Sequence, residues 1–377
     1  MEDKICIRRD LKKQVIGGGV SMNHERFVKD AISEWMNGDG PDSDIVISSR
    51  IRVARNLKDY PYPMLATNQQ SKEVLDQVAN VLNNEDLKTI SHFTLVSLGD
   101  MSELEKKVLV EKHLISPGLA NESRNGAVII NDNGSISIMV NEEDHLRIQC
   151  LYPGFQIREA WDLADQLDDI FEAHLNYGFD EKRGYLTSCP TNVGTGIRAS
   201  VMMHLPALVL TQQINRILSA VTQIGVTVRG LYGEGSEALG NLFQISNQIT
   251  LGQSETDIIE NLYSVARQII EHERAARAKL IQDSKLKIAD RINRSLGILT
   301  HAVIMDSKEA AQRLSDVRLG IDLDLIQKIP SKVLNELLVI TQPGFLQEDA
   351  GKLLNAEERD VRRAKIIRER FSRAAQV

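Results

Sequence analysis

The chain of 377 residues has few cysteines and no long apolar run. Its three cysteines, Cys6, Cys150 and Cys189, form no Cys-x-x-Cys pair, which argues against a structural zinc site. So sparse and odd a set also argues against a disulfide framework and fits a reducing cytosol. We find no apolar stretch long enough to span a bilayer and no signal-peptide pattern, so we expect a cytoplasmic protein without a membrane partner.

An excess of positive charge is also missing, since 45 Lys+Arg against 52 Asp+Glu give a formal net charge of -7. A general nucleic-acid binder is usually basic, so we expect no direct nucleic-acid partner, and any anion site must be local. The common ATP-binding signatures are absent too. There is no Gly-x-x-x-x-Gly-Lys-Ser/Thr loop, and there is neither a His-Arg-Asp nor an Asp-Phe-Gly motif. If the chain binds ATP, it uses another kind of site.

The hydrophobic pattern divides the chain into two regions, as its length suggests. Residues 45–250 mix strands and helices, whereas helical periodicity dominates after Ser254. We predict helices at residues 255–281, 284–296, 307–318, 331–340 and 356–373. The predicted domains are residues 22–280 and an all-helical region over 281–377. Residues 1–21 are expected to be a non-native extension or a disordered tail, with a short basic tail that binds an acidic partner as the alternative.

Arginines occur at alternating positions of predicted strands. Arg50 and Arg52 are two residues apart, so in an extended segment they share one face and Ile51 points to the other. Arg229 shares a face with Thr227 by the same rule. An arginine on the inner face of a sheet is costly unless it meets anions, and a triphosphate supplies oxygens that match the guanidinium fork. The alternative is that each arginine pairs with a carboxylate at the sheet edge.

Three loops carry further candidate groups. Residues 187–196 contain small residues and two glycines, which let backbone N–H groups approach a ligand closely. Cys189 in this loop is either a polarised thiolate or a buried structural cysteine. The acidic stretches at 141–145, followed by Arg147, and at 232–237 either orient a cation against an anion or form solvated turns.

Together these motifs resemble the phosphagen (guanidino) kinase family. The matching stretches are SSRIR at 48–52, NEEDH at 141–145 with Arg147, CPTNVGTG at 189–196 followed by RAS at 198–200, and RGLYGE at 229–234. The resemblance covers residues 45 to about 275. It implies an α+β fold in which helices flank an antiparallel sheet, and transfer of a phosphoryl group from ATP to a guanidinium. Mg²⁺ would accompany the phosphates and need few protein ligands, so we expect no protein metal site.

The same resemblance implies roles for individual residues. Glu143 and Glu234 would hold the guanidinium, one of them accepting its proton, with Cys189 lying against it as a thiolate. Phosphoryl transfer depends mainly on alignment and charge neutralisation, which suits these groups. The implied ATP-binding residues are Ser48, Ser49, Arg50, Ile51, Arg52, His113, Arg147, Arg198, Ala199, Ser200, Val201, Met202, Arg229, Gly230, Leu231, Tyr232, Gly233 and Glu234.

The chain departs from family members that act on free metabolites. Those carry a helical domain before the catalytic one, whereas the additional domain here is C-terminal. This arrangement is similar to the bacterial protein-arginine kinases, as are the stretches at 314–321, 341–345 and 359–364. The last stretch implies an allosteric phosphoarginine pocket, and without the resemblance it would be a solvated helix face. Its residues are Arg359, Asp360, Val361, Arg362, Arg363 and Ala364.

The resemblance also implies partners that no residue pattern identifies. They are protein substrates with exposed arginines, a heat-shock repressor among them, an activating zinc-finger protein, the Clp protease system and a second copy of the chain in a homodimer. The implied setting is the stress response and protein quality control. Two alternatives remain, namely a kinase of free arginine or another guanidino metabolite, and an inactive phosphoarginine-binding adaptor.

Overall fold

The computed structural model describes residues 25–29, 32–230, 238–327 and 329–374. The predicted tail over residues 1–21 lies outside these ranges. So do four of the predicted site residues, Leu231, Tyr232, Gly233 and Glu234.

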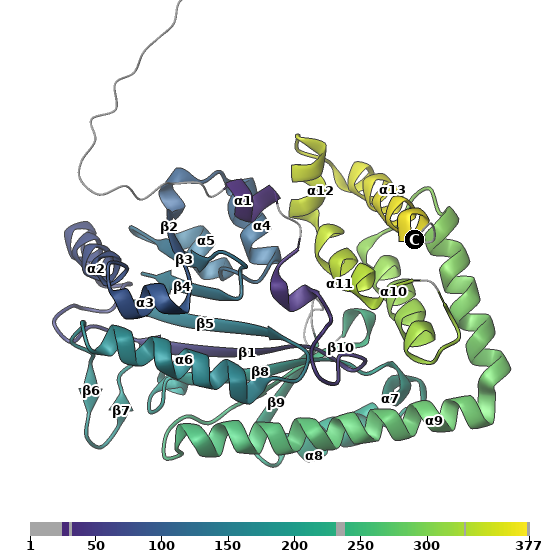
Figure 1. The fold of residues 1–377 in the computed structure, drawn as a ribbon, viewed down its shortest axis with the longest axis horizontal. Helices are drawn as coiled ribbons and strands as arrows, with labels where there is room; N and C mark the ends of the chain where they lie inside the picture. The colour runs from purple at the N-terminus through teal and green to yellow at the C-terminus, as the bar shows by residue number, and fades with distance from the viewer. Residues whose placement is uncertain (1–24, 30–31, 231–237, 328, 375–377) are drawn as a thin grey trace, which may run out of the picture.

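An eight-stranded sheet forms the centre of the molecule (Figure 1), with the order β2-β3-β4-β5-β1-β8-β10-β9. Every strand pair in it is antiparallel, which confirms the predicted α+β fold. The long central strand β1 (Val46–Arg55) pairs with β5 (Leu146–Pro153) and β8 (Ile197–His204). The remaining strands are β2 (Phe93–Ser97), β3 (Ala127–Asn131), β4 (Ile136–Val140), β9 (Val226–Gly230) and β10 (Leu242–Asn247), with β6 (Phe179–Asp180) and β7 (Gly184–Tyr185) forming a separate hairpin.

Helices cover both faces of this sheet. In chain order they are α1 (Glu25–Lys29), η1 (Glu34–Met36), α2 (Asn68–Val81), α3 (Glu85–Ile90), η2 (Leu98–Asp100), α4 (Glu103–Glu111), α5 (Pro117–Glu122), α6 (Ile157–Glu172), η3 (Pro190–Asn192), α7 (Pro206–Leu210), α8 (Ile214–Thr222), η4 (Leu239–Asn241), α9 (Glu255–His301), α10 (Ser307–Asp322), α11 (Ser331–Ile340), α12 (Pro343–Ala350) and α13 (Ala356–Ala374). None of them, in the part of the chain that the structure describes, is long and apolar enough to cross a membrane.

Side-chain alternation along the strands separates two cores. Ile51 and Val53 of β1 point into the first core, together with apolar residues of α2, α6 and the first part of α9. Val128 and Met139 point the other way, into the second core, which includes α4, α5 and the C-terminal helices α10 to α13. Figure 1 shows α6 and the first part of α9 on one side of the central strands, and α4 with α10 to α13 on the other. The polar positions of the central strands therefore lie on the second face.

The C-terminal third of the chain is built on one long helix. The helices predicted at 255–281 and 284–296 are one element, α9, with non-helical backbone at Ser284 (φ -147°, ψ 25°). Its second part carries α10 and α13. The domain boundary placed near residue 280 stays a prediction.

Two helical segments differ from what the sequence pattern suggests. The apolar spacing from Pro206 to Ile224 fits a single helix, but the segment is divided into α7 and α8, because Gln212 between them has a left-handed φ of 58°. The short helix α12 was not predicted, although Pro343 at its first position is favourable there.

Candidate active site

Strand register brings the predicted arginines together on the second face of the sheet. Arg52 of β1 lies opposite Arg198 of β8, and Arg147 of β5 lies opposite Ala54, two residues along β1. Arg229 enters from β9. These side chains line a cavity of about 380 Å³, whose described lining residues are Arg50, Arg52, Glu143, Arg147, Cys189, Thr191, Asn192, Arg198, Arg229, Gly230 and Gln244.

Within this cavity the positive charges outnumber the negative ones. Burial lowers the pKa of Arg52 well below its ordinary value, and the nearby Arg50, Arg147 and Arg198 lower it further. Burial and then Arg229 and Arg147 likewise lower the pKa of Arg198. The Nε of Arg52 is buried without a hydrogen-bond partner among the described atoms. A multiply charged anion would offset the repulsion among the arginines and would accept a hydrogen bond from Arg52 Nε. These residues therefore fit a triphosphate.

Neighbouring strands hold the arginines in place. Arg50 donates from Nη2 to Gln244 Oε1 (2.8 Å) and from Nε to Ser200 Oγ (3.4 Å). Arg198 donates from Nη2 to Ser246 Oγ (3.3 Å). Gln244 and Ser246 were not predicted as site residues. Their alternation along β10 with buried Phe243 and Ile245 was the signal that places them on the polar face.

A second cavity, of about 600 Å³, adjoins the first through Arg50, Arg52 and Arg147. His113, predicted to lie against the nucleotide, lines it together with the apolar residues Val110, Ile115, Pro117 and Met139. Burial, reinforced by Arg50 and Arg52, lowers the pKa of His113 to about 3. The imidazole is therefore neutral at physiological pH and lines the cavity without adding a charge.

Two adjacent glutamates follow β4, and their environments differ. Burial opposes ionisation of Glu142, but an ion pair with Arg147 (2.6 Å) and a hydrogen bond from Ser116 Oγ (2.5 Å) outweigh it and lower its pKa. Burial raises the pKa of Glu143, and the charges of Asp144 and Glu142 raise it further. The surroundings of the two carboxylates therefore shift their pKa values in opposite directions.

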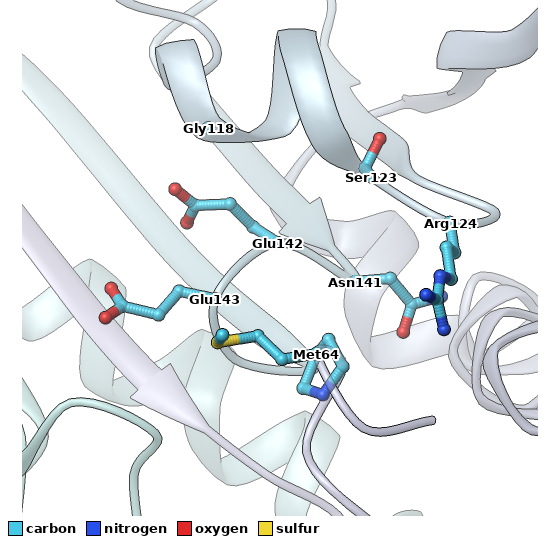
Figure 2. Close-up of a pocket in the computed structure, with 8 residues that line it drawn as sticks. Met64, Gly118, Ser123, Arg124, Asn141, Glu142 and Glu143 are labelled. Carbon is cyan, nitrogen blue, oxygen red and sulfur yellow. The ribbon is translucent and has the colours of Figure 1, made fainter. Parts of the chain in front are cut away.

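Glu143 lies between the arginine cavity and a third cavity of about 460 Å³. Figure 2 shows the Glu142 and Glu143 side chains extending from their turn away from Arg124, with Met64 beside Glu143. Pro63 and Met64 form an apolar wall of this cavity. Met64 and its neighbour Leu65 are each 76% exposed. The third cavity therefore opens to solvent beside a carboxylate.

The acidic turn and the cysteine loop are tied together. Asp144 accepts hydrogen bonds from Asn56 Nδ2 (2.6 Å) and from the backbone N–H of Ser188 (2.7 Å), next to Cys189. Cys189 lines the arginine cavity together with Glu143, and its Sγ lies 3.0 Å from Thr191 Oγ1. Gly196, with φ 68°, allows the close approach of this loop, since a Cβ there would lie 2.6 Å from the carbonyl oxygen of Ala54.

Several predicted nucleotide-binding residues have side chains elsewhere. Ile51, Ala199 and Val201 are buried in the first core, on the opposite face from Arg50, and Met202 lies in the second core. Both Ser48 and Ser49 are buried, and the hydroxyl of Ser49 bonds the carbonyl oxygen of Gly154 (2.9 Å). The nucleotide-binding role of these residues stays a prediction. The role of Glu234 and of Leu231, Tyr232 and Gly233 concerns residues outside the described ranges.

The predicted phosphoarginine motif lies on α13, in the C-terminal helices. Arg363 is buried and donates to the carbonyl oxygens of Thr341 (3.0 Å) and Met305 (2.9 Å) and to Asp360 Oδ1 (2.5 Å). Of the remaining motif residues, only Ala364 is buried as Arg363 is. Arg359 bonds Leu354, Arg362 bonds Asp349, Val361 is exposed, and Ala364 is buried. The motif does not line the arginine cavity.

Comparisons with known proteins match this chain along most of its length. The family model for the ATP:guanido phosphotransferase C-terminal catalytic domain matches residues 73–276. A model for the protein-arginine kinase McsB C-terminal domain matches residues 285–377. Over 350 residues the chain is 61% identical to the protein-arginine kinase of Brevibacillus brevis, covering 93% of this chain and 98% of that one. It is 56% identical to the protein-arginine kinase of Bacillus subtilis, covering 93% and 96%.

Solved structures share the fold. Lombricine kinase superposes with a TM-score of 0.54 at 25% identity, over 64% of this chain and 70% of that one. The duplicated taurocyamine kinase from Schistosoma mansoni gives a TM-score of 0.56 at 22% identity, over 70% and 38%. The chain belongs to the ATP:guanido phosphotransferase family, so it is a kinase that uses ATP. Within that family it carries the C-terminal domain of the protein-arginine kinases.

Proposed function

We propose that the protein transfers the γ-phosphoryl group of ATP to the guanidinium group of arginine side chains in other proteins. The observation that carries this proposal is Glu143, which lines both the arginine cavity and the open cavity beside Met64. A carboxylate at that junction suits a guanidinium that arrives from solvent and meets a bound phosphate. The relatives named protein-arginine kinase support the same acceptor.

The arginines form the phosphate-binding part of the proposed site. Arg50, Arg52, Arg147 and Arg198 bind phosphate oxygens and neutralise the charge that develops during transfer. Bound ATP would supply the phosphoryl group, and Mg²⁺ would neutralise part of the phosphate charge while needing few protein ligands. His113 provides a neutral ring beside the nucleotide rather than another cation.

The carboxylates prepare the acceptor. A guanidinium is protonated in water and is a poor nucleophile, so one N–H proton must leave as the nitrogen attacks. Glu143 accepts that proton while an N–P bond forms, the bond between the γ-phosphorus and its bridging oxygen breaks, and ADP departs. Glu142, paired with Arg147, keeps its charge and holds this arginine towards the phosphate. Cys189, which lines the same cavity as Glu143, lies against the guanidinium, and Glu234 is the second proposed carboxylate.

The open acceptor side favours a protein substrate over a free amino acid. Pro63 and Met64 offer an apolar wall for the aliphatic part of an arginine side chain. The exposed Met64 and Leu65 offer apolar contacts to the chain that carries it.

The wider setting rests on the resemblance alone. We propose a cytoplasmic homodimer that acts in the stress response, marks proteins for the Clp protease system, and has a heat-shock repressor among its substrates. A zinc-finger partner would activate it, and the motif on α13 would bind phosphoarginine.

Incubation with γ-labelled ATP and either free arginine or an unfolded protein tests the acceptor. We expect acid-labile label on the protein, lost in Glu143→Gln and retained in a control with an exposed glutamate changed, Glu181→Gln. Label on free arginine alone would favour the metabolite kinase. An inert wild type would favour the adaptor.

A further inference from the structure

One residue of the C-terminal helices reaches the cavity that contains His113. Gln342, in the turn between α11 and α12, lines this cavity of about 600 Å³ together with Arg50, Arg52 and His113. All the other described lining residues lie between positions 50 and 149. The cavity wall is therefore completed by a segment almost two hundred residues further along the chain.

The turn that carries Gln342 is held from the catalytic side by Glu111, at the end of α4. The Glu111 carboxylate accepts hydrogen bonds from the backbone N–H groups of Gly344 (2.7 Å) and Phe345 (3.0 Å), in the first turn of α12. These N–H groups have no partner within the helix, and an anion is favoured there. A Cβ on Gly344 would lie 2.7 Å from Glu111 Oε2, so a larger residue there would displace the carboxylate. Glu111 also lines the cavity, two residues before His113.

The same turn is held from the other side by α13. The buried Arg363 donates from Nε to the carbonyl oxygen of Thr341 (3.0 Å), the residue before Gln342. With Glu111 on one side and Arg363 on the other, the backbone at residue 342 is fixed. A side chain on fixed backbone loses little entropy when it binds a ligand.

The amide of Gln342 is oriented as well. Its Nε2 donates to the carbonyl oxygen of Leu338 (2.9 Å), in the preceding turn of α11. Among the described residues this leaves Oε1 available to accept a hydrogen bond from a ligand in the cavity.

We propose that Gln342 contacts the nucleotide, accepting a hydrogen bond at Oε1 from a donor of the nucleoside, and that Glu111 positions it. This inference rests on the proposed function, because it takes the cavity around His113 as the nucleoside side of the ATP site. The donor is the exocyclic amine of adenine or the ribose 2′-hydroxyl. The C-terminal helices thereby form part of the nucleotide site.

Direct titration of the full-length protein with ADP tests the contact without requiring turnover. Gln342→Ala should weaken ADP binding about 3- to 10-fold, the value of one hydrogen bond, and should raise KM for ATP more than it lowers kcat. Gln312→Ala, which removes a glutamine of α10 that does not line the cavity, is the control. Unchanged ADP affinity in a folded Gln342→Ala protein would overturn the proposal.

Two further arms identify the donor. If the amine donates, Gln342→Ala should bind IDP as the wild type does, while its loss for 2′-deoxy-ADP equals that for ADP. If the hydroxyl donates, Gln342→Ala should bind 2′-deoxy-ADP as the wild type does, while its loss for IDP equals that for ADP. An equal loss for all three nucleotides would overturn a direct contact to either group.

The positioning role of Glu111 is tested with a double-mutant cycle. Glu111→Gln should weaken ADP binding in the wild type but add little in the Gln342→Ala background. An undiminished effect in that background would show that Glu111 acts independently and would overturn its role. A wild type that binds ADP but phosphorylates no protein would contradict the proposed function and leave this inference standing.

Discussion

At the scale of residues, the opposite pKa shifts of Glu142 and Glu143 follow from their surroundings. The two are adjacent in sequence and chemically identical. One is paired with Arg147, and the other is raised in pKa by burial and by the carboxylates on either side. Their pKa values differ because the fold brings Arg147 of β5 to Glu142.

The pH dependence of the reaction should report Glu143. Proton acceptance needs the carboxylate, so the rate should fall as pH decreases through a pKa raised above the ordinary 4.5. Glu143→Gln should abolish most activity and remove this acidic limb from what remains. The measurement is kcat/KM for a protein acceptor across acid pH, with ADP affinity as the control for folding. An unaltered acidic limb in the variant would assign the titration to another group.

Sequence reasoning found the arginines but not the polar groups around them. Alternation within β1 placed Arg50 and Arg52 on one face without any knowledge of partners. Alternation along β10 could have placed Gln244 on the polar face, and Glu142 lies in the acidic stretch at 141–145. Their contacts with Arg50 and Arg147 are known only from strand pairing and the turn after β4. Register depends on contacts far apart in sequence, which no local pattern specifies.

At the scale of elements, a buried ion pair joins the end of β1 to α6 and to the cysteine loop. Arg55 donates to Asp168 Oδ2 from Nη2 (2.5 Å) and Nε (2.9 Å), and from Nη1 to the carbonyl oxygen of Thr195 (2.8 Å). Its guanidinium stacks 3.4 Å from the ring centroid of Tyr185. The pair therefore fixes the loop that carries Cys189 against the sheet.

Arg55→Ala should be strongly destabilising. It leaves Asp168 buried and unpaired, which costs about 3–5 kcal/mol of unfolding free energy. Urea unfolding of the two proteins measures the loss, and Arg55→Lys, which keeps the charge without the fork, should lose less. A loss below about 1 kcal/mol for the alanine variant would mean that this pair contributes little to the fold.

The short helix α12 shows why some elements escape prediction. It has only eight residues, too few for its own propensity to stabilise it in water. Glu111 of α4 caps its first N–H groups, and Leu346 and Phe345 are buried against the second core. These tertiary contacts stabilise α12, so its local sequence alone gives little indication of a helix.

At the scale of the whole molecule, buried polar contacts join the catalytic region to the C-terminal helices. Arg318 of α10 donates to the carbonyl oxygen of Ser43 (2.7 Å), and Asn335 of α11 donates to that of Met36 (3.1 Å). Asp322 lies between Arg318 and Arg277, the latter on α9. Figure 1 shows α9 running beneath the sheet and then along the C-terminal helices.

Asp322 should make this junction sensitive to pH. Burial, only partly opposed by Arg318 and Arg277, raises its pKa from 3.8 to about 6. The folded state then binds a proton more tightly than the unfolded state, so its contribution to the free energy of unfolding decreases as pH rises from about 4 to about 6. Asp322→Asn should remove that decrease, which urea unfolding across this range measures. Parallel pH curves for the two proteins would contradict the assignment.

Mass spectrometry of a protein mixture treated with ATP and this enzyme, kept under non-acidic conditions, tests the central claim most directly. The account predicts phosphate on arginine side chains of the mixture, absent when Glu143→Gln replaces the wild type. Phosphate confined to serine, threonine or free arginine would contradict it.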